Sequence, residues 1–264
     1  MDNILWWNVR GLNAPNKQKE VKLLYSREGI GLAGLVETKI KGSKIEQVAN
    51  KLFEGWGSMT NLDYHPNERI WLVWRTDYSQ IRMVSGMAQA ITYEVVYRSL
   101  QKIMMLTVVY VFNTKEERRT LWNYLEAVGV NVSQPWIIMG DFNVVLHMDN
   151  RIGGNPVSMA EVKEFNECVE NCGLLEFPKQ RSRYTWNDKH GGSIIFSKID
   201  WVFVNSEWLD SMPDFSTTFL PEMINDHSPM KLSMLNSPKK GRKQFKYYNV
   251  WSSHPLFLER VKAG

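Results

Sequence analysis

The sequence predicts an α/β fold in which two packed β-sheets carry helices on their outer faces. Short apolar runs rich in Val, Ile and Trp recur along the chain, and such runs are typical of buried strands. Amphipathic stretches with helix-start signals lie between these runs, and they are interspersed with the strands rather than alternating strictly with them. This order favours two face-to-face sheets over a single parallel sheet.

Seven apolar segments carry the strand signal. In chain order they are residues 4–9, 31–36, 70–74, 103–111, 136–140, 199–204 and 231–235. Each is short enough to be a strand rather than a helix, and several are bounded by Gly, Asn or Asp, which favour turns.

Helix starts are predicted where a Ser or Thr precedes a Glu by three residues, because each side chain can then bond a free amide of the first turn. The pairs are Ser43 with Glu46, Thr114 with Glu117, and Ser158 with Glu161. The first and last of these helices place apolar residues three and four positions apart, which predicts that they cover sheet faces. Gly173 is expected to end the last one.

Length and composition favour one large domain, which we assign to residues 1–235. The chain has 264 residues, of which 44% are hydrophobic, and this is enough for a sizeable core. The formal net charge of +4 permits a basic face for a polyanion but does not establish one. The composition changes near Asn236, so residues 236–264 are predicted to be a basic linker and the start of a truncated segment. A targeting or phosphate-binding role for this linker is an open alternative.

Cysteine usage and hydropathy indicate the compartment. Cys168 and Cys172 are the only cysteines, and their four-residue spacing in a predicted helix fits buried thiols better than a disulfide framework. The N-terminus has no signal-peptide pattern, and no apolar run reaches the length of about 18 residues that a membrane helix needs. We therefore expect an intracellular protein without a membrane segment.

Polar side chains stand at the ends of the predicted strands, where a rigid sheet can bring distant loops together. Alone, each has an ordinary explanation as a turn or cap. Asp200 is harder to explain in this way, because a carboxylate between Ile199 and Trp201 is costly to bury without a cationic partner. His227 is the partner that we expect. The full set is Asn8, Glu37, Tyr110, Asn113, Asp141, Asn143, Asp200, Asp226 and His227.

Seven motifs resemble, in order, the signature blocks of the endonuclease/exonuclease/phosphatase superfamily. They are WWNVRGLN (6–13), LVETK (35–39), VYVFN (109–113), IMGDFN (138–143), YTW (184–186), KIDWVFVN (198–205) and NDHSP (225–229). One block alone is weak evidence, whereas seven in the same order are specific. The resemblance implies a four-layer, deoxyribonuclease-I-like α/β sandwich of two mixed β-sheets flanked by helices, with a cleft at one end of the sheets.

The resemblance also implies roles for individual residues. Asp141 would activate the attacking water, together with the other catalytic candidates Asn143, Asp200, His227 and Tyr110. The metal site, for Mg²⁺ with Mn²⁺ as the alternative, falls on Asn8, Glu37 and Asp226. Such a site suits the chemistry, because a phosphodiester repels hydroxide and Mg²⁺ prefers oxygen ligands.

Contacts to DNA are implied for a further set of residues. Gly191 and Gly192 indicate a hairpin turn whose equivalent in the family lies against a DNA groove, with His190 beside it. For the charged members of the set, a solvated surface charge is an equal alternative. The set is Asn113, Thr185, Arg10, Trp186, Lys189 and Lys198.

Within the superfamily, the chain resembles the endonuclease part of plant LINE-type retrotransposon proteins. The similar stretches include PWIIMGDFNVVLHMDNRIGG, ECVENCGLLEF and RYTWND, and FKYYNVWSSHPLFL resembles the junction with reverse transcriptase. The resemblance implies a nick in one strand of double-stranded DNA, a 3′-hydroxyl that primes reverse transcription, a longer polyprotein and nuclear residence. The alternatives are a catalytically idle nucleic-acid-binding module and a small-molecule phosphatase of the same fold.

Overall fold

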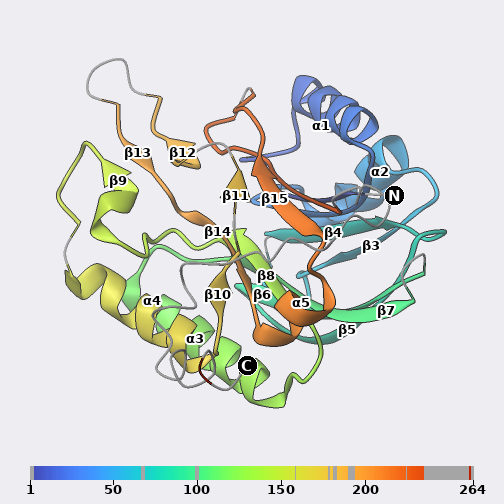
Figure 1. The fold of residues 1–264 in the computed structure, drawn as a ribbon. Helices are drawn as coiled ribbons and strands as arrows, with labels where there is room; N and C mark the ends of the chain where they lie inside the picture. The colour runs from blue at the N-terminus through green and yellow to red at the C-terminus, as the bar shows by residue number, and fades with distance from the viewer. Residues whose placement is uncertain are drawn as a thin grey trace. The chain divides into compact units, whose positions relative to one another are not determined.

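The computed structural model describes residues 3–66, 69–98, 101–157, 159–177, 179–180, 183–189, 194–223, 225–234 and 262. The chain forms two compact units, Met1–Met234 and Leu235–Gly264, and the first contains the sheets and the helices that flank them (Figure 1). Ser158 and the predicted turn at Gly191 and Gly192 lie outside the described residues, and so does the predicted linker and truncated segment at 236–264 except for position 262. Across the described ranges, no helix is long and apolar enough to cross a membrane.

The first sheet has seven strands and is mixed. Its β1–β2 and β11–β15 pairs are parallel, and its other pairs are antiparallel. In spatial order the strands are β11 (Lys179–Gln180), β15 (Phe215–Phe219), β16 (Met230–Met234), β1 (Asn3–Asn8), β2 (Ile30–Val36), β4 (Ile70–Arg75) and β3 (Trp56–Thr60).

The second sheet has six strands and is also mixed, because β7 and β8 are parallel. In spatial order its strands are β10 (Leu175–Glu176), β14 (Asp200–Val204), β8 (Trp136–Asp141), β7 (Lys102–Tyr110), β6 (Ala90–Tyr97) and β5 (Ser79–Met87). A small third sheet contains β12 (Trp186–Asn187), β13 (Phe196–Ser197) and β9 (Arg151–Ile152).

Helices lie on the outer faces of the two large sheets (Figure 1). Apolar side chains of α1 and α2 pack against the first sheet, and those of α3 and α4 pack against the second. The helical elements are α1 (Pro15–Glu28), α2 (Gly42–Leu52), α3 (Lys115–Asn131), the 3₁₀ turn η1 (Met148–Asn150), α4 (Met159–Asn171) and α5 (Ser206–Ser211).

Alternation along the central strands produces the layers. In β1, Ile4 and Trp6 join the core between the sheets, whereas Leu5 and Trp7 join the core beneath α1 and α2. Strands buried on both faces have continuous apolar sequences, as the strand segments of this chain do. The predicted four-layer sandwich of two mixed sheets flanked by helices is confirmed.

The predicted helix starts have different outcomes. Thr114 is the N-cap of α3, and its hydroxyl accepts a hydrogen bond of 3.4 Å from the Glu117 amide. The predicted cap at Ser43 is wrong, because the N-cap of α2 is Lys41, two residues earlier, and it has no side-chain cap. The Lys44 amide donates to the Lys41 carbonyl at 2.8 Å, so Ser43 already lies inside the first turn.

Candidate active site

Strand pairing brings two acidic side chains together at one end of the second sheet. Asp141 is the last residue of β8, Asp200 is the first of β14, and the two stand directly opposite in the antiparallel register. Both are buried, with exposed fractions of 1% and 0%. Because directly opposite residues project from the same face, both carboxylates point toward the layer between the sheets.

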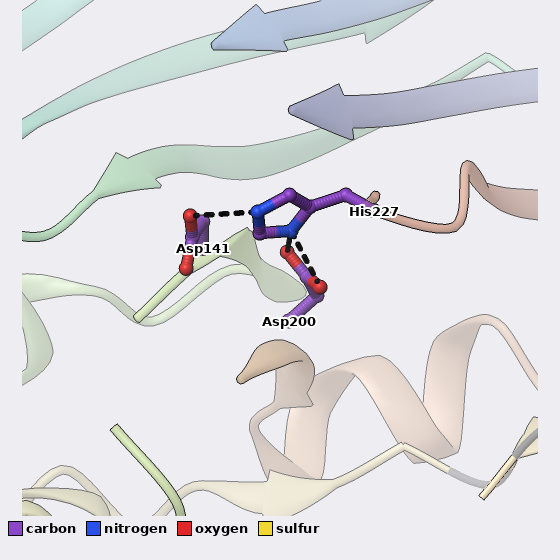
Figure 2. A group of neighbouring side chains, drawn as sticks. All are labelled: Asp141, Asp200 and His227. Carbon is purple, nitrogen blue, oxygen red and sulfur yellow. Dashed lines mark hydrogen bonds and ion pairs between the residues drawn. The ribbon is translucent and has the colours of Figure 1, made fainter. Parts of the chain in front are cut away.

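His227 lies between these two carboxylates (Figure 2). Its Nδ1 is 3.1 Å from both oxygens of Asp200, and its Nε2 is 3.9 Å from Oδ2 of Asp141. The expected pairing of Asp200 with His227 is therefore present. Trp7 donates from Nε1 to the His227 carbonyl at 3.1 Å, which fixes the backbone from the first sheet.

The charges around His227 determine its protonation. Burial has the largest effect and lowers its pKa, but the combined negative charges of Asp200, Asp141 and Asp226 outweigh it and raise the pKa of His227 to about 9. The imidazole is therefore cationic at neutral pH. The Asp141, Asp200 and His227 ligand atoms lie within 4.8 Å of one another, which resembles a metal-binding group. Within the group, His227 is hydrogen-bonded to Asp200, whereas Asp141 lies beyond hydrogen-bond distance of Nε2 and acts on the imidazole through its charge.

Asp141 is oriented by two amides. Asn8 donates from Nδ2 to Oδ2 at 2.8 Å, and the Asn143 backbone amide donates to Oδ1 at 2.9 Å. Burial raises the pKa of Asp141 to about 7, the charge of His227 opposes this rise, and the charge of Asp200 adds to it. Asn143 has a φ of 49°, and its side chain donates to the Val111 carbonyl at 2.6 Å. The carboxylate thus has a fixed orientation and a proton affinity suited to neutral pH.

A second pair of acids stands across from Asp141 at the end of the first sheet. Val36, the last residue of β2, pairs with Asn8 of the parallel strand β1. Glu37 is the next residue after Val36, so it lies beside Asn8 at the end of the sheet. Lys39 lies 2.8 Å from Glu37, and Arg10 lies 3.8 Å from it. Asp226 accepts from Arg10 and, at 3.0 Å, from Nε1 of Trp186.

Most of the predicted site residues line one polar cleft of about 300 Å³. Tyr110 stands on its wall, where burial, followed by the charges of Glu37 and Asp141, raises the pKa of Tyr110 to about 12. The phenol therefore keeps its proton and can donate a hydrogen bond. The predicted residues on the cleft wall are Asn8, Arg10, Glu37, Tyr110, Asn113, Asp141, Asn143, Trp186 and His227.

Two of the residues predicted to contact DNA are buried in the described structure. Thr185 is fully buried, and its hydroxyl accepts from the amides of Ile199 at 3.2 Å and Asp200 at 3.1 Å. Lys198 is 4% exposed, donates to Glu176 and lies 3.7 Å from the centre of the Trp201 ring. Both side chains point inward and support the strand that carries Asp200.

Lys189 and Asp226 do not stand on the cleft wall. Lys189 is exposed, has a φ of 52°, and donates from Nζ to the Asn225 carbonyl beside the loop that carries Asp226. Asp226 is 8% exposed behind the guanidinium of Arg10. The predicted groove contact of Lys189 stays a prediction.

The cleft also contains Arg151 and Ser197, which the sequence analysis missed. Nε of Arg151 donates to Oγ of Ser197 at 3.0 Å, and the two residues pair across β9 and β13. In the sequence, Arg151 shortly precedes Gly153 and Gly154, and such a glycine pair is typical of an ordinary surface turn. Only the pairing of the small third sheet brings this arginine to the cleft.

Comparison with known proteins places this geometry in a wider context. The sequence profile of the endonuclease/exonuclease/phosphatase family matches residues 5–214. No curated protein matches the sequence.

Solved structures share the fold at low sequence identity. The endonuclease domain of TRAS1, a telomere-specific non-LTR retrotransposon, is 13% identical with a TM-score of 0.69, over 91% of this chain and 100% of that chain. The AP endonuclease LMAP from Leishmania major is 16% identical with a TM-score of 0.68, over 89% of this chain and 87% of that one. TDP2 of D. rerio, complexed with single strand DNA product, is 14% identical with a TM-score of 0.60, over 88% and 97%. At these identities the likeness establishes the fold, which is the predicted deoxyribonuclease-I-like one.

Proposed function

This chain belongs to the endonuclease/exonuclease/phosphatase family, and on that premise we propose that it is a metal-dependent endonuclease that nicks one strand of double-stranded DNA. One observation carries the proposal. Asp141 and Asp200 from one sheet and His227 from the loop before β16 meet in a polar cleft that Asn8 and Glu37 also line. A buried acid–histidine–acid centre beside oxygen ligands suits hydrolysis of a phosphodiester.

The residues in the cleft and directly beside it fit a divalent cation. Glu37 and Asp226 are carboxylates only about one-tenth exposed, and Asn8 offers an amide oxygen nearby. The guanidinium of Arg10 already pairs with both acids, so the site demands positive charge. We propose Glu37, Asn8 and Asp226 as the residues that hold Mg²⁺ or Mn²⁺. When bound, the cation would neutralise negative charge on the phosphate.

Asp141 is proposed as the group that orients the attacking water and takes its proton. Asn8 and Asn143 hold the carboxylate by one hydrogen bond to each oxygen, so it cannot rotate away from the cleft. Its raised pKa of about 7 makes it a better proton acceptor than an ordinary aspartate. The water oxygen bonds to phosphorus, the bond from phosphorus to O3′ breaks, and O3′ takes up a proton to become the 3′-hydroxyl.

His227 and Tyr110 are proposed to stabilise the phosphate as negative charge grows on it. Nδ1 of His227 is committed to Asp200, which leaves Nε2 as the nitrogen facing Asp141 and the cleft. A cationic imidazole donates a charge-assisted hydrogen bond, and the protonated phenol of Tyr110 donates a neutral one. Asn113, Arg10, Trp186 and Arg151 line the cleft where flanking DNA would lie.

The resemblance to plant LINE-type proteins supports a specific setting for this nick. We propose that the 3′-hydroxyl primes reverse transcription, that the chain works within a longer polyprotein containing reverse transcriptase, and that it acts in the nucleus. Residues 1–235 would form the endonuclease domain, and residues 236–264 would begin the connection to the next one. The retrotransposon endonuclease domain with a similar fold is consistent with this setting.

Plasmid relaxation tests the proposed activity. We expect conversion of supercoiled to open-circular DNA with Mg²⁺, and loss of this conversion with EDTA. Asp141→Asn should lower the nicking rate by about 10²–10⁴-fold, because it removes the proton acceptor but keeps the shape. The product ends should be extended by a DNA polymerase without prior phosphatase treatment, since they carry a 3′-hydroxyl.

Asp210→Asn is the matched control for this experiment. It makes the same substitution at an exposed position of α5, which follows the far end of β14 from Asp200, and it should leave the rate unchanged. DNA binding without nicking by the wild-type chain would support the idle binding module instead. Release of phosphate from phosphoinositides without DNA cleavage would support the phosphatase.

A further inference from the structure

Arg10 stands on the cleft wall and places its guanidinium between the carboxylates of Glu37 and Asp226. Its Nη1 donates to Asp226, and its Nε lies 3.8 Å from Oε2 of Glu37. The side chains of Glu37 and Asp226 are 11% and 10% exposed, whereas that of Arg10 is 48% exposed. The two carboxylates are therefore largely desolvated, and their negative charges need a nearby cation. The guanidinium of Arg10, in contrast, is exposed to solvent on one side.

The backbone holds Arg10 at this point. Its φ of 42° lies in the left-handed region that residues other than glycine rarely adopt. Oδ1 of Asn8 accepts from the Arg10 amide at 3.0 Å, and Nζ of Lys17 donates to the Arg10 carbonyl at 3.0 Å. Both sides of the residue are thus fixed, so its side chain is the part that can move.

A second cation near Glu37 makes a simpler contact. Nζ of Lys39 lies 2.8 Å from Oε1 of Glu37. Among the ion pairs in the described part of the chain, those of Arg10 are the ones that join a single cation to both Glu37 and Asp226. Its guanidinium thus stands where the proposed metal ligands converge.

We propose that Arg10 is a tethered counter-cation of the metal site, whose guanidinium pairs with Glu37 and Asp226 until a divalent cation displaces it. This inference rests on the proposed metal-dependent function. A guanidinium and a divalent cation compete for the same two carboxylates, because their positive charges repel each other at this distance. Competition lowers the apparent affinity for the cation, so Arg10 sets the concentration at which the site fills. Once displaced, the guanidinium stays on the cleft wall, where a phosphate oxygen can accept its hydrogen bonds.

Metal affinity in the absence of DNA tests this role. Isothermal titration of Mg²⁺ and of Mn²⁺ into the full chain would compare wild type, Arg10→Ala and Arg151→Ala. Both variants remove one positive charge from the same cleft, but Arg151 bonds Ser197 and no carboxylate in the described structure. We expect Arg10→Ala to bind the cation about five- to tenfold more tightly, as loss of a partly exposed ion-pair competitor implies, and Arg151→Ala to change affinity by less than about twofold.

Thermal unfolding gives a second measurement. In EDTA, Arg10→Ala should melt below wild type, because Glu37 and Asp226 lose their shared cation. Saturating Mn²⁺ should then raise its melting temperature more than that of wild type. If Arg10→Ala does not fold, Arg10→Gly replaces it, since glycine adopts the positive φ without strain.

The inference is overturned if Arg10→Ala binds the cation no more tightly than wild type, or gains no more than Arg151→Ala. Its failure and that of the proposed function are distinguishable. Tighter metal binding by Arg10→Ala in a chain that never nicks DNA would contradict only the proposed function. Metal-dependent nicking with unchanged affinity in Arg10→Ala would contradict only the role of Arg10.

Discussion

The charge of His227 links the proposed chemistry to the stability of the fold. The imidazole is nearly inaccessible to solvent and bonds Asp200, whose carboxylate is completely buried. An unpaired buried carboxylate is strongly unfavourable, so a cationic imidazole offsets a cost that a neutral one would leave. The same proton is therefore needed for the folded state and for donation into the cleft.

Stability should fall as the pH rises from about 7 through about 9. The folded pKa of His227, about 9, is above its usual value of 6.5, so the folded chain holds this proton where the unfolded chain has lost it. The contribution is complete below pH 6.5 and is lost as the pH passes 9, with a size on the order of 3 kcal/mol. Urea unfolding midpoints measured from pH 6 to 10 would check it. Asp200→Asn should flatten this slope, and a slope that stays the same in that variant would exclude the pair as its cause.

Lys198 shows how a lysine with a predicted DNA role serves the fold. Lys198→Met should lower the free energy of unfolding by about 1–2 kcal/mol, because the apolar stem is kept while the charged bond to the half-buried Glu176 is lost. DNA affinity should stay the same. Lys163→Met is the matched control, since Lys163 is 70% exposed and should change stability by less than about 0.5 kcal/mol. Weaker DNA binding by Lys198→Met would show instead that Lys198 contacts DNA, as the sequence predicts.

At the scale of single elements, the end of β8 determines where Asp141 stands. The strand pairs with β7 on one side and β14 on the other, so small shifts of β8 move Asp141 relative to Asp200. Gly140, the residue before Asp141, has no room for a side chain. A Cβ added there would lie 2.5 Å from Cβ of Val109 and 2.6 Å from its carbonyl oxygen.

Gly140→Ala should therefore separate β7 from β8. We expect a loss of about 1–3 kcal/mol in the free energy of unfolding and a larger proportional loss of nicking, because the strand that moves carries Asp141. Gly42→Ala is the control, since a Cβ there meets only Leu62 at an ordinary 3.5 Å and helix α2 tolerates alanine. Full activity in Gly140→Ala would show that the register at Asp141 does not depend on this close contact.

Some strands were missed by the sequence analysis. The second sheet contains β5 and β6, and the first contains β3 and β15, none of which lies in a predicted apolar run. In β5, buried and exposed residues mix along SQIRMVSGM, so the segment lacks the continuous apolar character of the central strands. The strand structure of β5 depends on its pairing with β6 more than on its own composition.

At the scale of the whole molecule, the positions of the arginines matter more for DNA binding than the net charge of +4. Arg10 and Arg151 stand on the cleft wall. Binding of a polyanion there should release counterions, so DNA affinity should fall steeply with salt. Net charge alone would predict only a weak dependence.

Arg151→Ala should weaken DNA binding and reduce the slope of log affinity against log salt by about 1, as expected for one lost phosphate contact. The measurement uses an Asp141→Asn background, so that the duplex stays intact. Arg119→Ala is the control, because Arg119 pairs with Glu164 on the outer helices and should leave the slope unchanged. An equal effect from both variants would contradict a role for the cleft in DNA binding.

The sequence by itself determined seven of the strands and the positions of the polar residues at their ends. A strand buried on both faces must be apolar along its whole length, so a polar residue at its end is conspicuous, as with Asn8 and Asp141. The same reasoning identified the partner of Asp200, because a buried carboxylate needs a cation and His227 was the expected one.

Only the tertiary structure decided which of these side chains face the cleft. Asn8 bonds Asp141 across 133 positions of the chain, and His227 bonds Asp200 across 27. Lys198 turns inward while Arg151 reaches the cleft, although both are basic residues beside short strands. Local sequence sets the alternation of side chains along a strand, but the partner of each side chain depends on which distant strand pairs beside it and in which register.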